Sequence, residues 1–120
     1  MEAINILNKF EKFDELWTPK VIGALNGQHV KLAKIKDEFV WHSHADEDEL
    51  FMVFRGTLHM AFRDKTVVVE PGEMIIVPKG VEHCPRTNGE EVYILLFEPI
   101  ETKHTGAVEH ERTVKQYDWI

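Results

Sequence analysis

A succession of short apolar segments, each ended by a turn signal, is the feature that most limits how this chain can fold. The dipeptide Asn26-Gly27 favours a two-residue hairpin turn and separates the segments 20–25 and 28–36. Further turns are indicated at Gly56, Asp64-Lys65, Pro71-Gly72 and Pro78-Lys79-Gly80. The other candidate strands cover 38–44, 49–55, 57–63, 66–70, 74–77, 81–87 and 91–98. Many short strands at this spacing predict an all-β sandwich or barrel.

Both ends of the chain are expected to pack on this β-rich body. Residues 3–13 carry apolar residues at helical spacing, which predicts a short N-terminal helix: Ile4, Leu7, Phe10 and Phe13. We expect the helix to close one side of the core, with docking of a partner as the alternative. The tail after Pro99 is more polar, but Val114, Tyr117 and Trp119 are expected to pack back on the body. No linker or repeat divides the sequence, so a single domain over residues 1–120 is expected.

Charge and cysteine content narrow the classes of function. The 120 residues include 14 Lys+Arg and 21 Asp+Glu, a formal charge of -7, whereas phosphate contact needs a basic face. Binding to nucleic acid or to an anionic membrane is therefore not expected. The single cysteine, Cys84, allows no intrachain disulfide, and no apolar run reaches the length of a membrane span. The first residues lack the unbroken apolar core of a signal peptide, so a cytoplasmic location is expected.

The stretch HSHADEDELF, residues 42–51, contains two histidines and four acids. Residues two apart on a strand face the same way, so His42 and His44 would project side by side. Imidazole is a common metal ligand, although two unrelated surface or core histidines are the alternative. Glu49 opens an apolar segment and differs from the three acids before it, which fit a solvated loop. A carboxylate facing inward there would be costly to bury unless a cation lay beside it.

A third histidine, His83, follows the turns of PGEMIIVPKGVEH, residues 71–83. With it the chain resembles the cupin superfamily, whose first motif has a His-x-His pair, then Glu, then Gly. That motif is matched by His42, His44, Glu49 and Gly56. The second motif consists of Gly, then Pro-x-Gly, then His, and it is matched by Gly72, Pro78, Gly80 and His83. The resemblance spans roughly residues 28–98. It departs at Lys36, where the first motif often begins with Gly, and at Thr87, where the second often ends with Asn.

The resemblance implies a double-stranded β-helix, a small jelly-roll barrel with core motifs at 36–56 and 72–88 and one divalent transition metal per chain inside. Carried over position by position, the metal ligands are His42, His44, Glu49 and His83. Imidazole and carboxylate ligands suit Fe, Mn, Ni, Zn or Cu. An octahedral ion held by four protein groups keeps two positions open for water, substrate or oxygen. Cys84 follows His83 and is expected to face away and to pack.

Three classes of activity remain open. The resemblance allows a metal-dependent dioxygenase, and it also allows an isomerase or epimerase acting on sugar or keto-enol substrates. A module that binds a metal or a small molecule without turnover is the third, because a fold does not decide among functions. Oxygenase-type chemistry is slightly favoured.

Side chains on the same strand faces as the motif residues predict a mainly apolar pocket for a small organic molecule. Alternation predicts these groups, each sharing one face of its strand: Phe51, Val53 and Arg55 with Glu49; His59 with Ala61; and Val92 with Ile94 and Leu96. His59 is a candidate base, with a structural role as the alternative. The remaining histidines, His29, His104 and His110, are expected at the surface. Trp41 is expected to pack against other residues.

The segments 49–55 and 91–98 are apolar on both faces, whereas a barrel wall exposed on one side would alternate. We expect the N-terminal helix to cover one outer face and a second subunit to cover the other. An isologous homodimer is the expected assembly.

Overall fold

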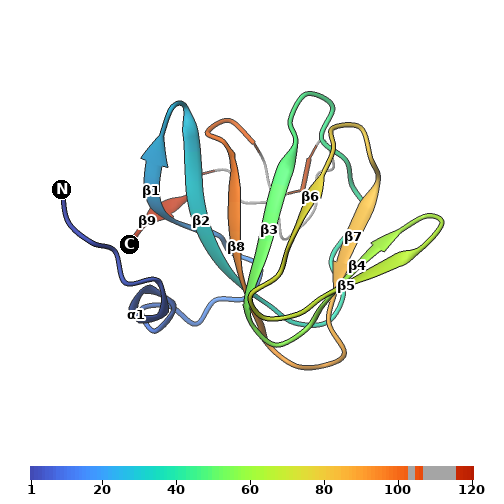
Figure 1. Ribbon diagram of the computed structural model, residues 1–120, viewed down its shortest axis with the longest axis horizontal. Coiled ribbons are helices and arrows are strands. Elements are labelled where there is room, and N and C mark those ends of the chain that lie inside the picture. Colours follow the sequence, from blue (N-terminus) through green and yellow to red (C-terminus); the bar gives the residue numbers. More distant parts are fainter. Residues whose placement is uncertain (103–104, 107–115) are drawn as a thin grey trace.

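Two β-sheets face each other across a shared core in the computed structural model, which describes residues 1–102, 105–106 and 116–120 (Figure 1). The larger sheet has the strand order β6-β3-β8-β2-β1-β9, and the smaller sheet has the order β5-β4-β7. The elements are α1 (Ile6–Phe10), β1 (Lys20–Leu25), β2 (Gln28–Ile35), β3 (Glu49–Arg55), β4 (Leu58–Phe62), β5 (Thr66–Val69), β6 (Met74–Val77), β7 (His83–Arg86), β8 (Val92–Pro99) and β9 (Asp118–Trp119). The expected all-β jelly-roll fold with a short N-terminal helix is confirmed.

Turn chemistry sets the pairing of the larger sheet. Asn26 and Gly27 have positive φ values of 49° and 75°, the conformation that a type I′ hairpin turn requires and that these two residue types tolerate. β1 and β2 therefore pair antiparallel, with Leu25 opposite Gln28. β2 pairs with β8, and β8 pairs with β3, both antiparallel. The strands β2, β8 and β3 thus lie side by side in the middle of the sheet.

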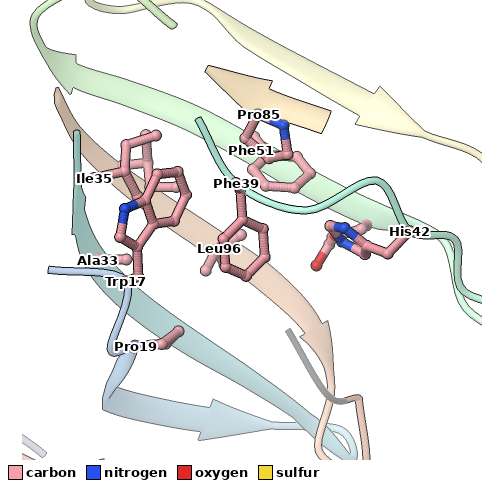
Figure 2. Close-up of a pocket in the computed structure, with 11 residues that line it drawn as sticks. Trp17, Pro19, Ala33, Ile35, Phe39, His42, Phe51, Pro85 and Leu96 are labelled. Atoms are coloured by element: carbon pink, nitrogen blue, oxygen red, sulfur yellow. The ribbon is translucent and has the colours of Figure 1, made fainter. Parts of the chain in front are cut away.

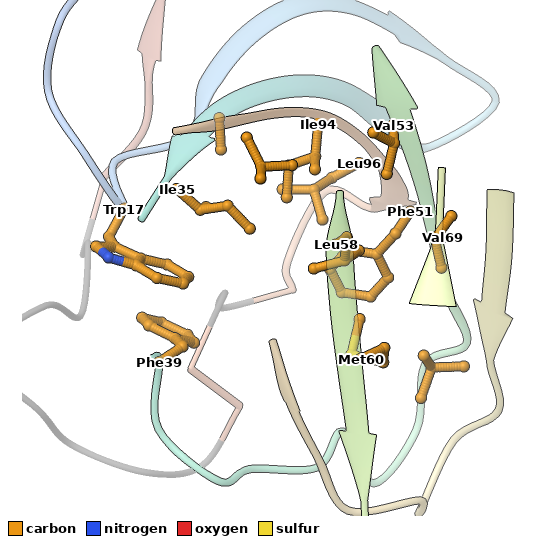
Figure 3. Packing of buried hydrophobic residues seen from close by; sticks show 13 residues of the cluster. Trp17, Ile35, Phe39, Phe51, Val53, Leu58, Met60, Val69, Ile94 and Leu96 are labelled. Atoms are coloured by element: carbon orange, nitrogen blue, oxygen red, sulfur yellow. The ribbon is translucent and has the colours of Figure 1, made fainter. Parts of the chain in front are cut away.

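Alternation along these strands decides what faces the barrel interior. Every second residue of β8 is buried, and Phe51 alternates with half-buried residues on β3 in the same way. These side chains pack against Leu58 and Met60 of the smaller sheet (Figure 3). The interior is mainly apolar, but the same alternation also buries two carboxyl groups, those of Glu49 and Glu98.

The helix α1 covers part of the outer face of the larger sheet, as expected. The Asn5 side chain caps it by accepting a hydrogen bond of 3.0 Å from the backbone nitrogen of Asn8. Phe10 is buried and stacks on Tyr93 of β8 with 4.8 Å between ring centroids, and its ring lies 5.9 Å from that of Phe54 on β3. The outer faces of β3 and β8 are therefore apolar here because the helix packs on them.

The helix is shorter than the predicted span of 3–13. Ile4 and Leu7 are exposed, whereas Phe10 at its end and Phe13 after it are buried. So short a helix gains little from its own hydrogen bonds, and packing decides its extent. The apolar spacing marked which side chains are available for packing: Phe10 and Phe13 are buried, whereas Ile4 lies near Gly23 of β1 but stays half exposed.

The predicted strand at 38–44 is wrong. The segment is extended but makes only two isolated bridges to the β7 region, Glu38 with Arg86 and His42 with His83. Pro85 lies between those bridges and has no N–H to donate, although its carbonyl accepts from Phe39 N at 3.0 Å. The proline therefore interrupts the ladder. The two ends of the segment still remain fixed to β7.

The tail packs back on the body, as expected, in its described part. The Tyr117 ring lies 3.7 Å from Lys31 Nζ, and the Trp119 ring makes an edge contact with His29 at 5.6 Å although Trp119 is 60% exposed. β9 pairs parallel with β1; it is too short to have shown a periodic pattern. Val114, His104 and His110 lie outside the described residues.

Candidate metal centre

Four buried side chains from three separate places in the sequence meet inside the barrel. His42 and His44 lie on the extended segment between β2 and β3, Glu49 begins β3, and His83 begins β7. One donor atom from each lies within 4.8 Å of the donor atoms of the other three. The four residues grouped by motif spacing are thus brought together in space.

Backbone contacts hold the histidine segment in place. His42 and His83 exchange backbone hydrogen bonds of 3.1 and 2.9 Å, and Gly80 N donates to the carbonyl of His44 at 2.7 Å. Gly106 packs on the same segment with a φ of 62°, and a Cβ there would overlap the carbonyl oxygen of Ser43. Only glycine allows this approach without displacement. The segment is therefore fixed on two sides although it is not a strand.

One of the loop acids also has a structural role. Asp48 accepts a hydrogen bond of 2.9 Å from the backbone nitrogen of Lys79, in the turn that precedes β7. The interpretation of residues 46–48 as a purely solvated loop is therefore incomplete. Asp48 links the loop before β3 to the turn that places His83.

The distances among the donor atoms suit one ion. Glu49 Oε1 lies 3.2 Å from His44 Nε2 and 3.3 Å from His83 Nε2. Ligands about 2.1 Å from a metal lie about 3.0 Å apart at right angles and about 3.4 Å apart in a tetrahedron. These spacings match the edges of a coordination polyhedron, and the residues present therefore fit a transition metal ion.

The same donor atoms have no hydrogen-bond partner among the described residues. His42 Nε2, His44 Nε2, His83 Nε2 and Glu49 Oε1 are all buried and unsatisfied, because the close N···O approaches lack hydrogen-bond geometry. Leaving one such atom unpaired costs about 1–3 kcal/mol. Four such atoms directed at one point are expected where a cation completes the site, not in a core built for stability alone.

Hydrogen bonds at Nδ1, on the far side of each ring from the centre, orient the imidazoles of His42 and His83. His42 Nδ1 lies 2.9 Å from the carbonyl oxygen of Val40, and His83 Nδ1 lies 2.9 Å from that of Val81. A carbonyl oxygen can only accept, so Nδ1 carries the proton in both rings. The lone pair of each neutral ring is then on Nε2, which faces the centre. This arrangement is how metal-binding histidines are usually held.

The electrostatics of the four side chains favour the binding of a cation. Burial, followed by repulsion from His83, lowers the pKa of His42 to about 4. Burial opposes ionisation of Glu49, but contacts with Glu98, His44 and His83 outweigh it and hold the pKa of Glu49 well below its usual range. Burial also opposes protonation of His44, but Glu49 outweighs it and raises the pKa of His44. At neutral pH the centre thus has a neutral His42 and an ionised Glu49.

Two further charged residues belong to the centre and were missed. Glu98 of β8 contacts Glu49, and its other neighbour is Lys31 of β2, with Lys31 Nζ 2.9 Å from Glu98 Oε1. Burial, followed by the charge of Glu49, raises the pKa of Glu98 well above its ordinary value. The alternation that marks Val92, Ile94 and Leu96 as inward continues to Glu98. That signal could have identified it.

An apolar cavity of about 30 Å³ adjoins the centre, with His42 and Glu49 in its lining. Phe39 lies between Trp17 and His42 (Figure 2), stacked on Trp17 at 4.5 Å and edge-on to His42 at 5.5 Å. The rest of the lining is apolar: Pro19, Ala33, Ile35, Phe51, Pro85, Ile94 and Leu96. A cavity of this size holds about two waters, so a larger ligand has to displace part of the wall.

The other candidate residues lie elsewhere. His59 is paired with Val68, which is exposed on the outer face of the smaller sheet. The lining of the cavity does not include four of the candidate residues: His59, Val53, Arg55 and Val92. Trp41 packs against guanidinium groups, 3.9 Å from that of Arg63. Cys84 is buried, its Sγ lies 3.4 Å from the carbonyl oxygen of Phe39, and burial raises the pKa of its thiol. Cys84 is therefore a packing residue, as expected.

Comparison with known proteins agrees with this geometry. A family model described as Cupin domain matches residues 28–98. A crystal structure of a cupin-2 domain containing protein from Shewanella frigidimarina NCIMB 400 is 48% identical with a TM-score of 0.79, and the match covers 81% of this chain and 94% of that one. Protein NMB1881 from Neisseria meningitidis is 29% identical with a TM-score of 0.74, covering 82% and 99%.

A curated relative matches over a shorter range. The uncharacterized protein YdbB of Bacillus subtilis (strain 168) is 40% identical over 67 residues, 55% of this chain and 59% of that protein. The match therefore spans less than two thirds of that relative. Across the described residues, no helix has both the length and the apolar character needed to cross a membrane.

Proposed function

This chain belongs to the cupin family, and on that premise we propose that it is a metal-binding cupin acting on a small organic molecule. One divalent transition ion per chain would be held by His42, His44, Glu49 and His83. The observation that carries the proposal is the convergence of four buried donor atoms that have no partner among the described residues. Three imidazole nitrogens and one carboxylate oxygen suit Fe, Mn, Ni, Zn or Cu.

Such an ion, when bound, supplies a Lewis-acid or redox centre with two positions left for substrate, water or oxygen. The residues of this chain supply the rest of the site. His42 and His83 are oriented by their carbonyl partners, and Glu49 provides the negative charge that favours a cation. The apolar cavity wall would hold the apolar part of a substrate beside the centre once part of the wall has moved aside.

Oxygenase-type chemistry is the reaction class that we favour. The polar groups that line the cavity in the described residues, His42 and Glu49, already belong to the centre. A sugar or keto-enol isomerase needs a further base within reach, together with partners for the substrate hydroxyls. A substrate that coordinates the ion through one polar group and packs its apolar body on Phe51 needs neither. Binding without turnover is the second candidate, because the cavity is small.

Metal analysis tests the binding part of the proposal. The protein is purified without a nickel column, and its metal content is measured by mass spectrometry. We expect close to one equivalent in the parent chain, and very little in the double variant His42→Ala/His44→Ala, whose circular dichroism should stay that of a β-protein. His29→Ala is the matched control and should keep its metal. A double variant that still holds a full equivalent would show that the ligand assignment is wrong.

Activity measurements separate the reaction classes. A thermal-shift screen of small apolar acids and enols identifies ligands, and oxygen uptake is then followed with iron-loaded protein. Rapid oxygen consumption with one of these ligands supports an oxygenase. Zinc as the native metal, with ligand binding but no turnover, would instead favour the binding module.

We also propose that the chain forms a homodimer through the outer face of the larger sheet that α1 leaves uncovered. Met74 and Ile76 on β6 are 59% and 55% exposed. They are paired with Met52 and Leu50 of β3, whose side chains share that face. β6 is the edge strand there, so a second copy would bury both the apolar side chains and a free strand edge.

A further inference from the structure

A second buried carboxyl group lies beside the one assigned to the metal. Leu50 of β3 is paired with Phe97 of β8, so Glu49 and Glu98 occupy the next opposed positions and point to the same face. Glu98 is fully buried. Lys31, on the adjacent strand β2, is fully buried as well, and its Nζ lies 2.9 Å from Glu98 Oε1. Lys31, Glu98 and Glu49 thus form a row across three neighbouring central strands, visible side by side in Figure 1, in which Lys31, paired with Leu96, reaches Glu98 diagonally.

This row is held firmly at the lysine end. Lys31 Nζ also lies 3.4 Å from the carbonyl oxygen of Thr102 and 3.7 Å from the centre of the Tyr117 ring. Both neighbours come from the chain after β8, so the tail closes over the ammonium group. At the other end, the carboxyl groups of Glu98 and Glu49 are in contact, and Glu98 Oε2 is buried without a hydrogen-bond donor among the described residues.

Fold stability alone gives no reason for this arrangement. Replacing a buried ion pair with apolar side chains of similar size is often neutral or stabilising. A row that ends on a metal ligand has a different use, because groups next to a ligand set its orientation and its affinity for the ion. We propose that Glu98, held by Lys31, is a positioning residue that fixes the Glu49 carboxylate with Oε1 directed between His44 and His83. This inference rests on the proposed metal site.

The chain offers a graded set of variants. Glu98→Leu alone would leave Lys31 buried without its ion-pair partner, which is strongly destabilising. The test variant is therefore the double change Lys31→Met/Glu98→Leu, which removes both charges and keeps the volume. Glu98→Gln is the conservative variant, since an amide can accept from Lys31 and donate towards Glu49. Glu91→Leu, an exposed acid just before β8, is the matched control.

Cobalt(II) is the probe, because both its affinity and its visible absorption report on the ligands. We expect the double variant to fold, to bind cobalt about 10–100-fold more weakly than the parent and to show a changed absorption spectrum. Glu98→Gln should stay close to the parent in both measurements, as should Glu91→Leu. Affinity is measured by competition with a chelator, and folding by circular dichroism.

The outcomes separate this inference from the proposed function. A parent chain that binds no cobalt overturns the metal site and this inference together. A parent chain that binds one equivalent, alongside a double variant with the same affinity and spectrum, overturns the positioning role alone. If the double variant fails to fold, Glu98→Gln decides instead. Loss of cobalt affinity in that folded variant would show that Glu98 acts through its charge and not through positioning.

Discussion

Replacing His42 with phenylalanine should remove a specific part of the pH dependence of stability in the metal-free protein. The His42 ring is buried and lies edge-on to Phe39 at 5.5 Å, so a phenyl ring of similar shape can occupy the same space. The change removes the imidazole and its hydrogen bond to Val40. This loss lowers the free energy of unfolding by the same amount at every pH. What changes with pH is the proton that His42 takes up on unfolding.

The size of the effect follows from the two pKa values. Burial, with repulsion from His83, lowers the pKa of His42 from 6.5 to about 4 in the folded chain. Because the folded-state pKa is depressed, the unfolded state binds the extra proton, and the stabilising contribution is complete above pH 6.5 and is lost as the pH falls towards 4. Between pH 8 and pH 5 the loss amounts to about 2 kcal/mol, and it reaches about 3 kcal/mol below pH 4.

Urea unfolding with a chelator present measures this contribution. The free energy of unfolding is determined at pH 8, 7, 6 and 5 for the parent chain and for His42→Phe. The parent should lose about 2 kcal/mol more than the variant between pH 8 and pH 5. The protonation of His44 affects both proteins and largely cancels in the difference. Two curves that stay parallel over this range would refute the claim that His42 is buried in its neutral form.

Three further predictions concern the metal, the loop that holds it and the assembly. Metal affinity should be high at pH 8 and fall through about pH 6 to 5, because protonation begins at His44, whose pKa is raised. The far-ultraviolet circular dichroism should remain that of a β-protein over this range. Unfolding on metal removal would instead show that the ion is needed for the fold. Gly106→Ala should weaken metal binding about 10-fold, because its Cβ would push Ser43 and the adjacent histidines aside; titration with cobalt checks this, and unchanged affinity counts against the packing described. Light scattering at micromolar concentration should give twice the 14.0 kDa mass of the chain, and Met74→Lys/Ile76→Lys should give the monomer; a monomeric parent rules out the interface.

Local patterns predicted the parts of the fold that local chemistry determines. Turn residues such as Asn26-Gly27 fix hairpins within a few residues, and alternation along β8 separates inward from outward side chains. The strand expected at 38–44 failed because its pairing depends on Pro85, which is distant in sequence and lacks the N–H that a ladder needs. No pattern within the segment itself reports that interruption.

Part of the candidate site could likewise be predicted from the sequence, and part of it could not. Motif spacing grouped His42, His44, Glu49 and His83, and the fold brings their donor atoms together. Lys31 and Glu98 were missed because a charged residue on a strand is usually read as facing solvent, and the ion pair that permits their burial joins two different strands. Alternation along β8 could have marked Glu98 as inward, but its pairing with Lys31 becomes visible only when the register of β2 against β8 is known.

The spacing of the four donor residues along the chain also has a consequence for how the protein is made. Glu49 opens β3 and His83 opens β7, so the strands β4, β5 and β6 are synthesised between them. During synthesis the early residues His42, His44 and Glu49 emerge well before the residue that completes the set. Contacts between distant parts of a chain form late in folding. Under the proposed function, high-affinity metal binding would thus be delayed until the second sheet has closed on the first, and a chain interrupted before β7 would retain only three of the four proposed ligands.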